Sequence, residues 1–238
     1  PEKREGYEKA ELVFDLDAKD LPVKSCCPDG KVCEICLARA KDLVLDFKVV
    51  IEDDLALRDV HYIYSGRGYH IRILDEDLMG IGDTERAFIL DYLRGNIVLE
   101  DQEKTRRGRD PTAYTGGYAG IFPRRFKDIL RYMGAEDLTS LGLTPRRAAN
   151  LLAARERLLA GERRWKDIEG DLEKILKKET KDFLTKVSTL IAGNLDAKVT
   201  VDVKRILRLP SSLHSKVSMR CVEIRDLEAF DPLRDAVP

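Results

Sequence analysis

The sequence of 238 residues lacks the features that mark several large classes of protein. No apolar run approaches the ~20 residues of a membrane-spanning helix, and the opening stretch has no apolar segment of the secretory type. Lys and Arg (42) balance Asp and Glu (43), so the net charge of −1 gives no general basic field, and a polyanion would need a local patch. There is no Gly-Lys-Ser/Thr phosphate loop and no internal repeat. We therefore expect a soluble, intracellular protein.

Cysteine is scarce but concentrated. The total of five cysteines is odd, and four of them lie between residues 26 and 36. This cluster is too tight for a disulfide framework. Cys26 and Cys27 are adjacent, and Cys33 and Cys36 have the C-x-x-C spacing. Four thiolates in so short a stretch are typical of a structural Zn²⁺ site. An iron–sulfur cluster and chance clustering remain as alternatives, and adjacent Cys26 and Cys27 leave open whether both bind; Cys221 is expected to be an ordinary buried thiol.

Hydrophobic patterning predicts the α/β class, with a mixed sheet packed against helices. We expect a strand in "AELVFDLDAKD" (10–20), a helix over about 37–51, a hairpin formed by "VHYIYS" and "YHIRIL", and a helix at about 83–95. β-favouring segments return in "AKVTV" and "KVSMRCVEI".

Between the two β-rich parts the pattern is helical. We therefore expect a first part of the core at 1–100 with a zinc knuckle at 26–36, an inserted helical subdomain at 101–192, and a second part of the core at 193–238. Thr144 and Pro145 resemble the cap and first residue of one helix. The stretch "RRGRDPTAYTGGYAG" (106–120), rich in glycine and threonine, is expected to be a loop.

Two carboxylates stand at the end of the first predicted strand. Asp15 and Asp17 are two residues apart, so both side chains leave the same face. Their mutual repulsion is relieved by a divalent cation such as Mg²⁺, which in proteins uses one or two carboxylates together with substrate phosphates. A polar strand edge is the simpler interpretation, but the strand is otherwise apolar and therefore buried.

Two further segments carry groups that bind anions. In "YSGRGYH", the glycines let the backbone approach a ligand while Ser65, Arg67 and His70 can donate to phosphate, although Gly-Arg-Gly also forms an ordinary hairpin turn. The second segment, "RLPSSLHSK", offers the following groups: Arg208, Ser211, Ser212, His214 and Lys216. Two such clusters and a pair of acids together predict a phosphoryl-transfer site.

In order and content these segments resemble the catalytic small subunit of the archaeal and eukaryotic DNA primase. "AELVFDLDAKD" resembles the family's first motif, "YSGRGYH" its second and "LDAKVTVDVKRILRLPSSLHSK" its third, with the cysteine knuckle between the first two. The single arginine in "SGRG" is the archaeal style, whereas the paired cysteines are closer to the eukaryotic knuckle. The chain is shorter than the family's small subunits and is similar to a trimmed core.

The resemblance implies roles for individual residues. Asp15, Asp17 and Asp196 would bind catalytic Mg²⁺ or Mn²⁺, with Asp202 as the rival third carboxylate. The nucleotide's triphosphate would be held by six residues: Ser65, Arg67, His70, Arg208, His214 and Lys216. The four clustered cysteines, Cys26, Cys27, Cys33 and Cys36, would hold structural Zn²⁺.

The same resemblance implies an activity and partners. The expected activity is template-directed synthesis of short RNA primers on single-stranded DNA from nucleoside triphosphates, by a nucleotidyltransferase that forms a heterodimer with the primase large subunit. The location would be the cytoplasm, at the nucleoid, in an archaeon and the nucleus in a eukaryote. The alternatives are a primase-polymerase of the repair or mobile-element type and a non-catalytic, zinc-containing nucleic-acid-binding module.

Overall fold

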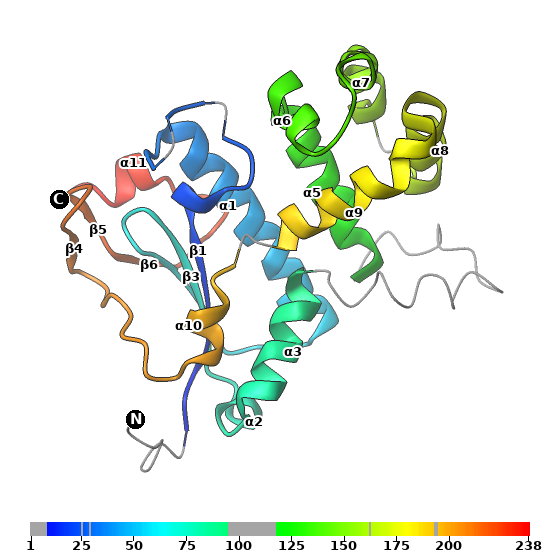
Figure 1. Ribbon diagram of the computed structural model, residues 1–238. Helices are drawn as coiled ribbons and strands as arrows, with labels where there is room; N and C mark the ends of the chain where they lie inside the picture. Colours follow the sequence, from blue (N-terminus) through cyan, green and yellow to red (C-terminus); the bar gives the residue numbers. More distant parts are fainter. Residues whose placement is uncertain (1–8, 25, 29, 95–117, 162, 193–194) are drawn as a thin grey trace. The chain divides into compact units, whose positions relative to one another are not determined.

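The computed structural model describes residues 9–238 with the exception of 25, 29, 95–117, 162 and 193–194. The chain divides into two units, one comprising Pro1–Leu21, Asp29–Leu93 and Asn194–Pro238, the other Pro22–Pro28 and Arg94–Gly193. The first contains the sheet, and the second is helical (Figure 1). The residue boundaries given above for three domains stay a prediction. None of the helices in the described residues is both long and apolar enough to cross a membrane.

The sheet of the first unit confirms the α/β class. Its strands, in the spatial order β1-β3-β2-β6, are β1 (Leu12–Asp17), β3 (Gly68–Ile73), β2 (Val60–Tyr64) and β6 (Val222–Ile224). All three pairings are antiparallel, so the strands do not run in mixed directions, contrary to the expectation of a mixed sheet. β2 and β3 form the predicted hairpin, and β1 is added at the outer edge of β3. A separate two-stranded sheet consists of β4 (Leu213–His214) and β5 (Met219–Arg220).

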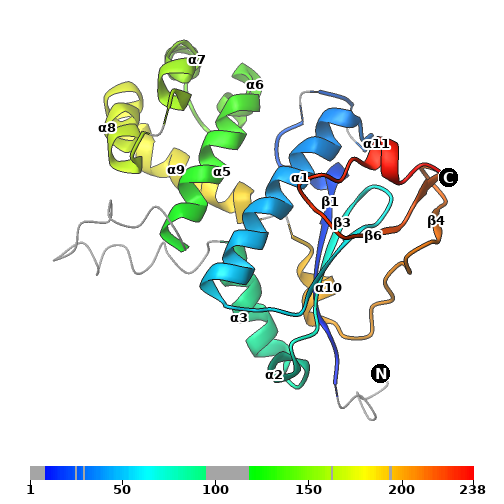
Figure 2. The same cartoon turned by 180° about the vertical axis from the view of Figure 1, so that it is seen from behind.

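One face of the sheet is apolar and carries the core of the first unit. Leu12, Phe14 and Leu16 alternate along β1 and are almost fully buried. Helix α1 (Glu34–Val49), which confirms the helix predicted after the cysteines, contacts β1 and β3 (Figures 1 and 2). Its buried Ala40, Val44 and Phe47 recur at helical spacing. The opposite face of β1 bears Asp15 and Asp17, because successive side chains of a strand alternate.

Shorter elements complete the first unit. They are η1 (Ala18–Asp20), the π-helical η2 (Val50–Asp54), α2 (Glu76–Met79), α3 (Asp83–Arg94), α10 (Ala197–Val201) and α11 (Pro232–Asp235). α3 confirms the helix predicted at about 83–95. The strand expected in "AKVTV" is wrong, because these residues form α10: the carboxylate of Asp196 caps it by accepting the N–H of Lys198 at 2.9 Å. Figure 1 shows α10 beside β1, which it contacts.

The second unit has a core of its own. Its helices are α5 (Tyr118–Tyr132), α6 (Ala135–Ser140), α7 (Pro145–Leu159), α8 (Trp165–Leu176), η4 (Lys177–Glu179) and α9 (Thr180–Ala192). Their apolar stripes meet in one cluster that includes Phe126, Leu151 and Leu172. α7 begins at Pro145 after Thr144, as expected, but without a side-chain capping bond. Of the loop predicted at 106–120, residues 106–117 lie outside the described part, and the last three belong to α5.

Candidate active site

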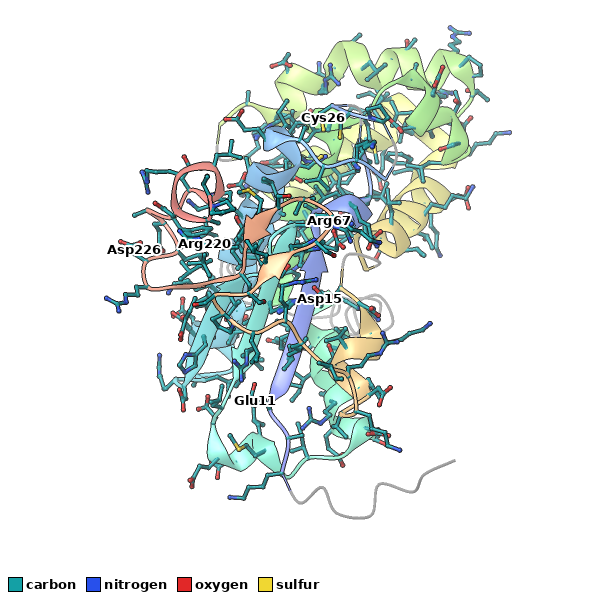
Figure 3. The ribbon with its side chains drawn as sticks, turned by 90° about the vertical axis from the view of Figure 1, so that its left-hand side faces the viewer. Glu11, Asp15, Cys26, Arg67, Arg220 and Asp226 are labelled. Carbon is teal, nitrogen blue, oxygen red and sulfur yellow. The ribbon has the colours of Figure 1, made fainter. Side chains whose placement is uncertain are left out.

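The acidic pair lies at the end of β1, opposite the hairpin formed by β2 and β3. In the register of the sheet, Asp15 faces His70 and Asp17 faces Gly68. Cross-strand partners lie on the same face, so the imidazole of His70 points to the same side as the two carboxylates. Its Nε2 is 3.5 Å from Oδ1 of Asp15. In Figure 3, Glu11 lies just before β1, Asp15 lies within the strand and Arg67 lies beyond Asp15.

Asp15 is an unfavourably placed acid. Burial, followed by the negative charges of Asp17 and Asp196, raises the pKa of its carboxyl group from 3.8 to about 7. Asp196 is close because its backbone N–H donates to the backbone oxygen of Asp15 at 3.1 Å. Asp202 instead accepts the N–H of Lys204 at 3.1 Å and has Arg205 as an ion-pair partner at 3.9 Å. The structure thus brings Asp15, Asp17 and Asp196 together.

The turn between β2 and β3 is fixed by backbone geometry. The N–H of Ser65 donates to the carbonyl of Gly68 at 2.9 Å, and Gly66 has φ of +99°, a conformation that glycine adopts without strain. The buried hydroxyl of Tyr64 donates to the carbonyl of Gly66 at 2.8 Å. A methyl group on Gly68 would collide with the carbonyl of Leu16 in β1. This turn therefore places Ser65 and Arg67 rigidly beside the acids.

Arg67 is held by one of those acids. Its Nε donates to Oδ1 of Asp17 at 3.1 Å and its Nη2 to Oδ2 at 2.5 Å, so the pair is bidentate. The carboxylate of Asp17 also accepts the backbone N–H of Lys19 at 2.9 Å and lies 3.7 Å from the Lys19 ammonium group. Nη1 of Arg67 is not used by this pair and still has two N–H donors.

The two histidines of the predicted site are buried and neutral. Burial, with the positive charges of Arg208 and Arg72, lowers the pKa of His70 to about 4. His214 lies on β4 and packs over Gly66. A Cβ atom added to Gly66 would lie 2.5 Å from the Cβ atom of His214. Burial, Arg208 and Arg67 lower its pKa as well. The backbone N–H of Lys216 donates to its Nδ1 at 3.2 Å, which leaves Nε2 as the protonated nitrogen.

The rest of the second anion cluster is only partly assembled. Arg208 donates to the carbonyl of Leu213 at 3.2 Å, and its charge acts on both histidines. Lys216 is exposed. Its backbone N–H contacts His214, and no contact of its side chain with the described residues is seen. Ser211 and Ser212 shape the loop: the N–H of Ser211 donates to the carbonyl of Cys221 at 2.7 Å, and the hydroxyl of Ser212 donates to the carbonyl of Leu209 at 2.6 Å.

Sequence reasoning missed two neighbours of this site. Arg72 lies on the same face as His70 and is held by both carboxylate oxygens of Glu11. Tyr64 fixes the carbonyl of Gly66 from the opposite face. The two-residue period of a strand could have identified Arg72, since it follows His70 by two residues. The sequence gives no comparable signal for the hydroxyl of Tyr64, because Tyr64 fits the pattern of an ordinary aromatic residue in the core of a strand.

The four cysteines that we predicted to bind zinc lie together. The sulfur atoms of Cys26, Cys27, Cys33 and Cys36 are all within 4.8 Å of one another. The Sγ atoms of Cys33 and Cys36 are 3.7 Å apart. A tetrahedral ion with Zn–S bonds of about 2.3 Å needs sulfurs about 3.8 Å apart. The cluster therefore fits Zn²⁺, and Cys33 stands directly before α1 as its N-cap residue.

The carboxylates also fit a hard divalent ion. Burial and the charges of Asp17 and Asp196 raise the pKa of Asp15 to about 7, and the three acids form an oxygen donor set whose repulsion a cation relieves. Beside them stand Arg67, Arg208 and neutral imidazoles that can donate to anionic oxygens. This combination of residue types is typical of metal-dependent enzymes that act on phosphate esters.

Comparison with known proteins gives the family. The profile described as DNA primase small subunit matches residues 14–226. "DNA primase small subunit PriS" of Methanothermobacter thermautotrophicus is 44% identical over 245 residues, covering 100% of this chain and 72% of that protein. The proteins of the same name from Methanobrevibacter smithii and Pyrococcus furiosus are 40% and 38% identical, again over 100% of this chain and over 73% and 71% of theirs. The chain belongs to the DNA primase small subunit family.

Proposed function

We propose that this chain is the catalytic core of a DNA primase and joins nucleoside triphosphates into short RNA primers on a single-stranded DNA template. The observation that carries the proposal is the convergence of Asp15, Asp17 and Asp196 beside the Ser65–Gly68 turn. Archaeal relatives named as primase small subunits support it, and they favour a cytoplasmic enzyme that pairs with a large subunit.

In this proposal Asp15, Asp17 and Asp196 hold two Mg²⁺ or Mn²⁺ ions. Such ions lower the pKa of the attacking 3′-hydroxyl and stabilise the departing pyrophosphate. Asp15 lies on a strand and Asp196 at a capped helix start, so the backbone already places both acids, whereas Asp17 would share its carboxylate between the ions and Arg67. Asp196 is the third carboxylate because its charge acts on Asp15, whereas Asp202 serves as a cap for the following loop.

The cationic and neutral donors bind the triphosphate. Arg67, anchored on Asp17 through Nε and Nη2, keeps Nη1 for a phosphate oxygen. Neutral His70 and His214 donate one N–H each without adding charge. Ser65 is placed by the same turn, and Arg208 and Lys216 complete the set from the second segment. Neutral imidazoles suit a site whose Arg67 and Arg208 already supply positive charge.

Incorporation of labelled nucleotide on single-stranded DNA tests the proposal. The reactions contain Mg²⁺ or Mn²⁺, with and without an annealed primer, and compare the wild type with Asp17→Ala. Asp53→Ala is the matched control, because Asp53 is an exposed acid of the same unit, on η2. We expect template-dependent product, also without a primer, from wild type and control only. Product that needs a primer would favour the primase-polymerase alternative, and incorporation by Asp17→Ala would refute the metal role.

A further inference from the structure

The positive charge of this chain is concentrated in its helical unit. Residues 22–28 and 94–193 contain 22 Lys and Arg against 15 Asp and Glu, a net charge of +7. The remainder contains 20 against 28, a net charge of −8. The nearly neutral net charge of the whole chain is therefore the sum of a basic unit and an acidic remainder. A unit with such an excess of positive charge attracts polyanions, and the positions of its charged side chains indicate which surface would bind them.

Six of the 22 Lys and Arg residues of the helical unit lie at one of its corners. Nη1 of Arg155, near the end of α7, donates to the carbonyl of Met133, after α5, at 3.0 Å. Nη1 of Arg163, before α8, donates to the carbonyl of Arg157 at 3.2 Å. These bonds join the ends of α5 and α7 to the start of α8 (Figure 1). We call this surface the α8 corner, and it consists of Arg131, Arg155, Arg157, Arg163, Arg164 and Lys166.

The corner is hollowed and only partly neutralised. A cavity of about 480 Å³ is lined by Arg163, Arg164, Lys166 and Lys174 together with Asp167, Gly170 and Asp171. Asp171 pairs with Arg163 at 2.8 Å and with Lys174 at 3.3 Å, while Asp167 pairs with Arg164 at 3.1 Å. Exposed Lys166 and Arg157 have no side-chain partner in the described part of the chain. Positive charge therefore remains at the rim.

Helix stability does not account for this arrangement. Arg131 and Arg157 stand in the last turns of α5 and α7, where a cation favours the helix dipole. Arg164 and Lys166, in contrast, stand at the start of α8, where the dipole disfavours positive charge, and Asp167 is the acid of that turn. Cations placed against the dipole point to a ligand of opposite charge.

An aromatic ring lies within the same corner. Trp165, the one tryptophan of the chain, begins α8 between Arg164 and Lys166 and is half-buried. Its ring meets those of Phe122 and Phe126 edge to face, each with centroids 5.2 Å away. Sites for single-stranded nucleic acid combine a cationic groove with aromatic rings on which bases stack. An acidic protein surface would need the cations alone.

We propose that the α8 corner binds the phosphate backbone of the single-stranded DNA template. This rests on the proposed function, because it is the template of primer synthesis that supplies the strand. Lys166 and Arg157 each contact one phosphate, and the cavity between Arg163 and Lys174 receives the backbone. The helical unit thereby holds DNA through a surface distinct from the acidic pair of β1.

The test measures binding of labelled oligo(dT) to the whole chain by fluorescence anisotropy over a range of salt concentrations. Arg157→Gln/Lys166→Gln removes two exposed charges whose side chains make no hydrogen bond or ion pair with the described residues. Lys177→Gln/Lys178→Gln is the matched control, since these exposed lysines of η4 remove the same charge from the same unit. Two lost phosphate contacts should weaken binding on the order of 25-fold at about 0.1 M salt and reduce the salt slope by roughly 1.4. The control should bind like wild type, and saturating oligo(dT) should change the emission of Trp165.

Equal affinity and equal salt slope for the two double variants would overturn the proposal, as would unchanged tryptophan emission at saturating oligo(dT). Unchanged DNA binding together with lost association of the large subunit would assign the corner to a protein partner instead. Failure of the primase function is read separately: it appears as absent nucleotide incorporation by the wild type, whereas the corner variant incorporates normally once template is saturating.

Discussion

Asp15→Asn should stabilise the fold at alkaline pH while removing activity. Asparagine keeps the size of the side chain but has no charge. It therefore avoids the cost of burying a negative charge and the repulsion by Asp17 and Asp196, the two effects that raise the pKa of Asp15. The expected gain in free energy of unfolding applies to protein in buffer without added divalent metal, where nothing else relieves the repulsion.

The magnitude follows from the pKa. A rise from 3.8 to about 7 is about 3 units, and at 1.36 kcal/mol per unit it corresponds to at most about 4 kcal/mol. The folded chain takes up a proton at Asp15 near pH 7, whereas the unfolded chain does so near pH 3.8. Between these values the folded state binds more protons, so the stability of the wild type falls as pH rises through this window. Above it the full cost is present, and below it the cost is absent.

Urea denaturation at about pH 8 and about pH 4 measures the effect. We expect Asp15→Asn to exceed the wild type at the higher pH and to match it at the lower. Asp53→Asn, which removes an exposed charge of the same unit, should show little difference at either pH. A variant that is no more stable than wild type at about pH 8 would refute the reasoning that burial and like charges strain this carboxylate.

Four further outcomes are expected. Tyr64→Phe removes the hydroxyl that fixes the carbonyl of Gly66, so it should cost about 1–3 kcal/mol and raise KM for nucleotide; an unchanged KM would separate the turn from binding. Gly68→Ala should push β1 away from β3 and abolish incorporation, as a steady-state assay would reveal. Cys33→Ser should lower both zinc content and the melting temperature, whereas Cys221→Ser should keep its zinc; zinc loss without a lower melting temperature would contradict a structural role. The hydrogen bond to Glu223 raises the pKa of His61, so its contribution to stability is present below about pH 6.5 and is lost as pH rises through the raised value; an NMR titration in which Glu223→Gln leaves that pKa unchanged would contradict this.

What could be predicted from the sequence is what depends on local pattern. The alternation of Leu12, Phe14 and Leu16 indicates a strand with one apolar face, and it places Asp15 and Asp17 on the other. The spacing of the cysteines alone indicates the cluster that the structure shows. The glycines of the Ser65–Gly68 turn have the positive φ and the close approach that the motif required. In each case a few adjacent residues contain the information.

What could not be predicted depends on neighbours distant in sequence. The β-branched residues of "AKVTV" favour a strand, but a cap from Asp196 and packing against β1 decide for α10. The pairing of Glu11 with Arg72 joins two strands whose register the sequence left open. The choice between Asp196 and Asp202 likewise needed the backbone bond that brings Asp196 to Asp15.

The electrostatics of this site run against stability, and that is informative about function. A chain selected for stability alone would place an amide or an apolar group at Asp15, because a half-buried acid whose pKa is raised to about 7 opposes folding at neutral pH. The neighbouring pairs of Asp17 with Arg67 and of Glu11 with Arg72 show that this sheet face can match an acid with a cation. Among the residues that the structure describes, Asp15 has no such cationic partner, since His70 at 3.5 Å is held neutral by its own burial and by Arg208. The carboxylate of Asp15, whose charge opposes folding, is therefore one whose charge a divalent ion would balance, as the proposed metal site requires.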